Sequence, residues 1–116
     1  MRRSRPLAWT ALAIGIGVAA ATPPAAHGQD DGYVLTFRDN KLEPAELPVP
    51  AGKEFKLVVK NADQTPEEFE SGDLKIEKII AGGSQIELMI KALEPGSYEV
   101  YGEFHEDTAK GHIVAQ

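Results

Sequence analysis

Short segments in which every second residue is apolar constrain this chain more than any other feature of its sequence. They follow one another toward the C-terminus, and their apolar positions are Tyr33, Leu35 and Phe37; Phe55, Leu57 and Val59; Ile86, Leu88 and Ile90; Tyr98 and Val100; and Ile113. Turn-forming residues separate them at 41–44, 50–52, 82–83 and 95–96. A period of two at this spacing predicts an all-β antiparallel sandwich of about seven or eight strands.

Helical periodicity is weak throughout this part of the chain. Residues 65–74 contain Pro66 and Gly72, and no 3.6-residue repeat of apolar side chains persists there. We therefore expect one helical turn at most, either within 65–74 or within 107–110.

The stretch before the last strands has a turn followed by a tyrosine that opens a strand, Leu93-Glu94-Pro95-Gly96-Ser97-Tyr98. This order resembles the tyrosine corner of Greek-key sandwiches, in which the hydroxyl bonds to upstream backbone. An ordinary hairpin turn with a packed tyrosine fits the same residues, so both interpretations stay open.

The first 28 residues differ in character from the rest. A basic start, Arg2, Arg3 and Arg5, precedes fifteen uncharged residues at 7–21 and a helix-breaking Pro pair. This order predicts a cleavable signal peptide over 1–28, with cleavage after Gly28 or after Ala26, and a mature domain over 29–116. We expect export to a bacterial periplasm; an uncleaved N-terminal anchor is the alternative, although the apolar run is short for a membrane span.

Charge and cysteine content exclude several classes of function. The formal charge is −6, and all 18 acidic residues but only nine of the 12 basic ones follow position 28, so that part carries −9. This balance argues against nucleic acid as a partner. The absence of cysteine excludes a disulfide scaffold and a blue-copper site, and no catalytic fingerprint is present, so we expect no enzyme.

The C-terminal third, residues 95–105 followed by 111–114, resembles the cupredoxins, which end in a PG-x-Y-x-F/V-x-C-x-x-H stretch and a final strand. The resemblance implies a Greek-key copper-binding fold, with Asn61 closing an upstream strand before a loop that carries the first ligand. This chain departs from the pattern: Gly102 stands at the copper-binding Cys, Glu67 or Glu68 at the first His, and no Met follows. His105 keeps the position of a ligand.

Four stretches are similar to a subgroup of cupredoxin-like domains found in Efe-type periplasmic iron-uptake proteins and near iron permeases: residues 37–44, 49–53, 68–70 and 93–98. This similarity implies a role in binding iron or copper and delivering it to a membrane iron permease or a periplasmic uptake protein.

We expect two loops at one end of the sandwich to supply the ligands. The candidates are Glu67, Glu68, Glu70, Glu103 and His105, with Glu106 and Asp107 beside them. Such an oxygen-rich set with one imidazole suits Fe(II), Fe(III), Mn(II), Zn(II) or Cu(II) and disfavours Cu(I). The alternative is a solvated acidic rim, which would serve a metal-free interaction module docking on a transport partner.

Overall fold

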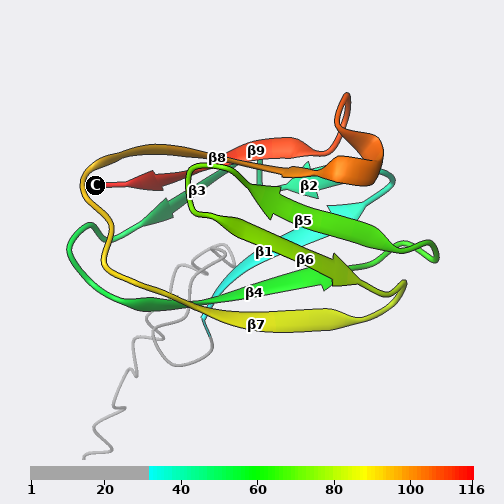
Figure 1. Cartoon of the computed structure of the whole chain (residues 1–116), viewed down its shortest axis with the longest axis horizontal. Helices are drawn as coiled ribbons and strands as arrows, with labels where there is room; N and C mark the ends of the chain where they lie inside the picture. The colour runs from blue at the N-terminus through cyan, green and yellow to red at the C-terminus, as the bar shows by residue number, and fades with distance from the viewer. Residues whose placement is uncertain (1–31) are drawn as a thin grey trace, which may run out of the picture.

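A computed structural model describes residues 32–116, and it confirms the all-β sandwich (Figure 1). Nine strands and one short 3₁₀ helix follow in the order β1 (Tyr33–Arg38), β2 (Lys41–Glu43), β3 (Glu46–Val49), β4 (Phe55–Asn61), β5 (Glu67–Ser71), β6 (Ile76–Ile80), β7 (Gln85–Ile90), β8 (Gly96–Gly102), η1 (Glu103–His105) and β9 (Lys110–Ala115). The signal peptide predicted over 1–28 lies outside the described residues.

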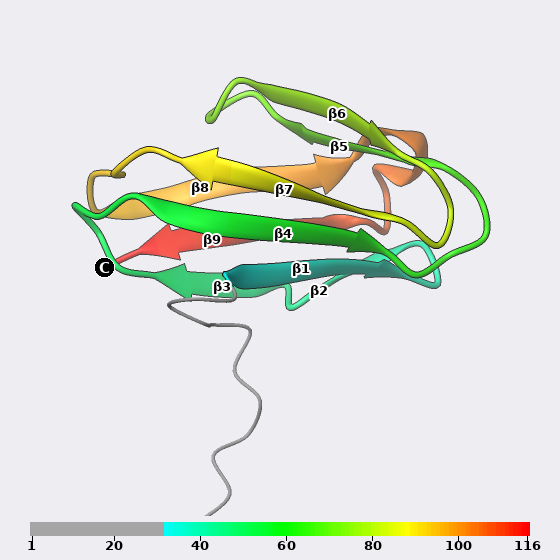
Figure 2. The same cartoon turned by 90° about the horizontal axis from the view of Figure 1, so that it is seen from below.

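The strands form two sheets that face each other (Figure 2). One has the order β2-β1-β4-β7 and the other β3-β9-β8-β5-β6, with β1 parallel to β4 and β3 parallel to β9. The alternating apolar residues meet between the sheets: Leu35, Leu57 and Val59 from the first sheet and Val100 and Ile113 from the second are fully buried. Period-two patterning thus predicted the core-facing side of β1, β4, β7 and β8.

Edge-to-face packing of Phe37 against Phe69 joins the two sheets near one end. Their ring centroids lie 6.2 Å apart with an interplanar angle of 65°, and both side chains are inaccessible to solvent. Because Phe69 lies on β5, this contact fixes the strand that carries the predicted glutamate ligands.

Three local predictions were wrong. Residues 41–44 are not a turn, because Asp39 and Asn40 both take positive φ and close a tight hairpin that pairs β1 with β2. Residues 65–74 hold strand β5 rather than a helical turn, since pairing with β6 and β8 outweighs weak local preference. Within residues 32–116 the one helical element is η1 at 103–105, before the expected 107–110.

The tyrosine corner is confirmed. The Tyr98 hydroxyl donates a 2.8 Å hydrogen bond to the carbonyl oxygen of Glu94, four residues upstream. This bond ties the start of β8 to the connection that crosses from the first sheet to the second.

One end of the sandwich, opposite the C-terminus, gathers η1 and the turns that follow β1, β4 and β6 (Figures 1 and 2). Asn61 closes β4 there, as the resemblance implied. Its buried amide donates to the carbonyl oxygens of Thr65 (2.8 Å) and Ile80 (3.1 Å) and accepts from the Asp63 N–H. Within residues 32–116, no helix is long and apolar enough to cross a membrane.

Candidate functional site

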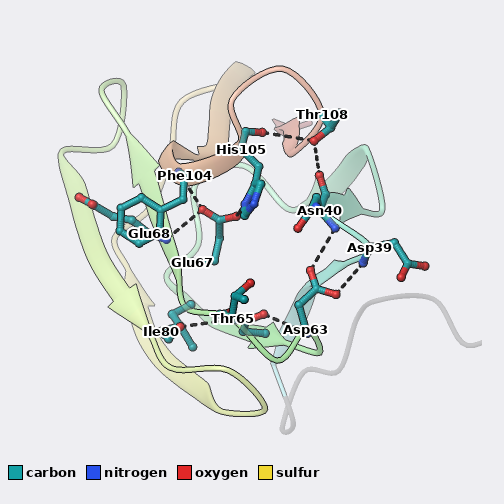
Figure 3. A network of polar contacts seen from close by, with 11 residues as sticks. Asp39, Asn40, Asp63, Thr65, Glu67, Glu68, Ile80, Phe104, His105 and Thr108 are labelled. Carbon is teal, nitrogen blue, oxygen red and sulfur yellow. Dashed lines mark hydrogen bonds and ion pairs between the residues drawn. The ribbon is translucent and has the colours of Figure 1, made fainter.

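Strand β5 sends its glutamates to opposite sides of the second sheet. Glu67 shares the inward face with Phe69, whereas Glu68 and Glu70 lie on the outer face, because successive side chains of a strand alternate. Figure 3 shows Glu67 and Glu68 pointing away from each other. The predicted ligand set is therefore divided into an inner pair and an outer cluster.

The inner pair is Glu67 with His105. Glu67 is 3% exposed, and its Oε2 lies 2.5 Å from Nδ1 of His105, while its Oε1 accepts the backbone N–H groups of Glu68 (3.1 Å) and Phe104 (2.9 Å) (Figure 3). Three donors thus satisfy the buried carboxylate, which lowers the cost of burying its charge. The His105 side chain remains 31% exposed.

Gly102 makes room for this arrangement. A Cβ at position 102 would lie 2.6 Å from Cδ of Glu67 and 2.9 Å from both carboxylate oxygens. The carboxylate therefore fills the space next to the position at which the resemblance places a thiolate. The residues present do not fit a blue-copper centre, because the chain has no cysteine and Glu67 closes the interior.

The outer cluster consists of Glu68 and Glu70 from β5, Glu77 from β6 and Glu103 from η1. One carboxylate oxygen of each lies within 4.8 Å of one oxygen of every other member. Glu70 and Glu77 are directly paired residues of the antiparallel β5–β6 ladder, and the packing of η1 against β5 adds Glu103. Tertiary structure thus brings four oxygen donors to one place on the sheet.

This cluster has no internal counter-charge. Among residues 32–116, no lysine or arginine forms an ion pair with any of its members. Glu68 is only 7% exposed, and within residues 32–116 its carboxyl group has only the other carboxyl groups of the cluster as side-chain hydrogen-bond partners; Oε2 of Glu70 is sealed from solvent without a partner. Buried carboxylate oxygens without donors are costly unless a proton or a cation reaches them.

The protonation of the outer cluster reflects this crowding. Hydrogen bonding to the Glu77 carboxyl, then burial and the charge of Glu103, raise the pKa of Glu68 to about 7. Hydrogen bonding to the Glu103 carboxyl, then burial and the charges of Glu103 and Glu77, raise the pKa of Glu70 to about 7 as well. Burial, followed by the charge of Glu70, also raises the pKa of the neighbouring Tyr101.

The structure brings together three of the five predicted ligands, Glu68, Glu70 and Glu103. Glu67 and His105 form the separate inner pair, and His105, Glu106 and Asp107 line a shallow open hollow of about 520 Å³ at the same end. Glu77 was not among the predicted ligands. Its signal is the turn at 72–75, because a hairpin closed there sets Glu70 opposite Glu77.

Comparison with known proteins agrees with this architecture. The chain is 44% identical over 80 residues to the uncharacterized protein RP394 of Rickettsia prowazekii (strain Madrid E), an alignment that covers 69% of this chain and 64% of that protein's length. The chain thus spans less than two thirds of its relative.

Solved structures show the same fold. Amicyanin from Paracoccus versutus superposes with a TM-score of 0.59 at 17% identity, covering 79% of this chain and 88% of amicyanin. A purple cupredoxin from Nitrosopumilus maritimus gives 0.56 at 18% identity, covering 72% and 98%. The profile described as "Cupredoxin-like domain" matches residues 10–115, so this chain belongs to the cupredoxin-like domain family.

Proposed function

We propose that this chain is an exported, non-enzymatic metal-binding protein in which Glu68, Glu70, Glu77 and Glu103 hold a hard cation on the outer face of the second sheet. The observation that carries the proposal is the convergence of four carboxylates, among them that of the buried Glu68 and that of Glu70, whose Oε2 is sealed from solvent without a hydrogen-bond partner in residues 32–116. A cation bound there would replace the missing donors and relieve the repulsion among the four groups.

The donor set decides which ions suit the cluster. Four carboxylate oxygens without sulfur or nitrogen favour hard cations such as Fe(III), Fe(II) and Mn(II), accept Cu(II) and disfavour Cu(I). The fold typically binds copper, but its usual copper position is closed by Glu67 in this chain. We therefore place the ion outside the sandwich and favour iron over copper.

The cellular role we propose is delivery of this ion to a membrane iron permease or a periplasmic uptake protein. The similarity of residues 37–44 and 93–98 to Efe-type iron-uptake domains supports that role, and the signal-like residues 1–28 support a periplasmic location. Exposed ligands suit transfer, because Glu77 and Glu103 remain open to solvent and a partner could reach the ion.

Terbium(III) provides a direct test, because it is a hard, oxygen-seeking cation whose luminescence a nearby tyrosine sensitises. Tyr101 is the cross-strand partner of Glu70 and lies beside the cluster. We expect saturable terbium luminescence that Tyr101→Phe abolishes and Tyr33→Phe leaves intact. Competition by Fe(II), Fe(III), Mn(II) and Cu(II) would then rank the ions.

The matched charge controls are Glu70→Gln and Glu46→Gln. Both remove one negative charge from the second sheet, but Glu46 lies on β3 at the edge opposite β6. We expect Glu70→Gln to weaken terbium binding strongly and Glu46→Gln to have little effect. Equal losses in the two variants would mean nonspecific attraction to an acidic surface and would contradict the proposal.

A metal-free interaction module is the second candidate. Phe104, half exposed beside Glu103, gives the acidic end an apolar contact point that a partner could cover. Co-purification with a permease after chelation of all metal, lost on Glu68→Lys with Glu103→Lys, would favour this role over metal delivery.

A further inference from the structure

Glu67 connects the inner pair to the outer cluster through η1. Two of the three hydrogen bonds to its carboxylate come from η1, from the N–H of Phe104 and from Nδ1 of His105. Glu103, the first residue of η1, belongs to the outer cluster. One buried side chain therefore anchors the helical turn that presents an outer ligand.

The anchor matters because η1 has little stability of its own. It is three residues long, has no buried residue and lacks a side-chain cap at its N-terminus. A single 3₁₀ turn of this kind keeps its position through tertiary contacts rather than through its own hydrogen bonds. Strand β5 supplies those contacts and also carries Glu68 and Glu70, so the Glu67 bonds fix Glu103 relative to two of its partners.

From this geometry we infer that Glu67 is the positioning residue of the acidic cluster: it contacts no ion, but it holds η1 so that Glu103 meets Glu68 and Glu70. Gly102 is needed for this arrangement, because any side chain there would push the Glu67 carboxylate away from η1. In this chain the Glu67 carboxylate thus fills the space beside the fold's interior copper position, and it holds in place a ligand of the metal site proposed on the outer face of the sheet. This inference rests on the proposed function.

The bonding pattern suggests two variants that separate position from charge. Both backbone N–H groups bond to Oε1, whereas His105 bonds to Oε2. The amide of Glu67→Gln can reproduce all three bonds, since its oxygen accepts from both N–H groups and its NH₂ donates to the imidazole in the other tautomer. Glu67→Asp keeps the charge but withdraws the carboxylate from η1 by one methylene.

The experiment measures terbium affinity of the folded wild type and of both variants, well below their unfolding temperatures. If Glu67 positions Glu103, Glu67→Gln keeps an affinity close to that of the wild type, and Glu67→Asp loses about 10- to 100-fold, the usual effect of disturbing a group that orients a metal ligand. The reverse order would mean that only the charge of Glu67 matters. Equal affinity in all three proteins would mean a purely structural role, and either result overturns the inference.

Amide hydrogen exchange of Phe104 in the metal-free proteins gives a readout that needs no ion. We expect slow exchange in the wild type and in Glu67→Gln, and faster exchange in Glu67→Asp. Equal exchange in all three overturns the inference even if the wild type binds terbium. If the wild type binds no terbium, the proposed function fails, and the positioning role of Glu67 fails with it.

Discussion

Glu70 and Glu77 are directly opposed residues of the antiparallel β5–β6 pair. Like charges in such positions destabilise a sheet, and two more carboxylates, from Glu68 and Glu103, face the same point. The second sheet therefore carries a local electrostatic repulsion that a bound cation would relieve.

Neutralising one member of the outer cluster should affect stability and metal binding in opposite directions. Because Glu70→Gln removes one of the four repelling charges, we expect the melting temperature of the metal-free protein to rise at neutral pH. The wild type should gain about 2.7 kcal/mol from a cation at a hundredfold excess over Kd, and the variant clearly less. Thermal melts with and without chelator test this. A lower melting temperature for metal-free Glu70→Gln would contradict it.

Stability of the metal-free protein should fall as the pH rises. The pKa of Glu68 and of Glu70 is about 7 in the folded protein against an ordinary value of 4.5. Between these values the folded state holds protons that the unfolded chain has released, so the free energy of unfolding decreases as pH rises through this interval and levels off above about 7. The causes of the raised pKa values are hydrogen bonds to the carboxyl groups of Glu77 and Glu103, then burial, then the charges of Glu103, Glu77 and Glu106.

Urea unfolding of the wild type and of Glu70→Gln across this pH interval checks the direction. The stability of Glu70→Gln relative to the wild type should increase as the pH rises, since the variant lacks one of the groups that must ionise. A difference that stays constant from about pH 4.5 to about pH 7 would show that the crowded carboxyl groups do not titrate in this interval.

The sequence specified the strands of the core better than the strands of the site. The apolar alternation in 33–38 and 55–61 marks β1 and β4 because their inward residues are large and apolar. In β5 only Phe69 is apolar, and the buried Glu67 takes an inward position that alternation reserves for apolar side chains. Glu77 enters the site through strand register, which depends on pairing between segments rather than on the residues of β6 alone.

Loss of the tyrosine corner should cost stability without affecting metal binding. Tyr98→Phe removes the hydrogen bond to the Glu94 carbonyl, so we expect a loss of about 1 kcal/mol in the free energy of unfolding. Tyr33→Phe is the matched control, because the Tyr33 ring packs edge-to-face on Phe55 and its hydroxyl forms no hydrogen bond within residues 32–116. Equal losses in the two variants would show that the bond contributes little.

Substitution of Asn61 should lower the free energy of unfolding more than substitution of most other residues outside the apolar core. Asn61→Ala leaves the carbonyl oxygens of Thr65 and Ile80 without their amide donor, and we expect a loss of about 2–4 kcal/mol in unfolding free energy. Asn40→Gly is the control, since glycine accepts the positive φ of that exposed turn residue. Urea unfolding distinguishes a large loss at position 61 from a small change at position 40.

Restoring the cysteine alone should not create a blue-copper site. Gly102→Cys places a Cβ within 2.6 Å of the Glu67 carboxyl carbon, so the variant should be destabilised and should lack an intense thiolate-to-Cu(II) absorption band. The clash disappears only when Glu67 also changes, because the carboxylate and the missing side chain compete for one space.

The double variant Glu67→His with Gly102→Cys tests this coupling. Together with His105 it offers the His₂Cys donor set of blue copper from the corresponding elements of the fold, so we expect it to bind Cu(II) and to gain the intense charge-transfer band. Visible absorption of the two variants titrated with Cu(II) compares them directly. An equally intense band in the single variant would show that Glu67 yields to a thiolate and does not close the interior.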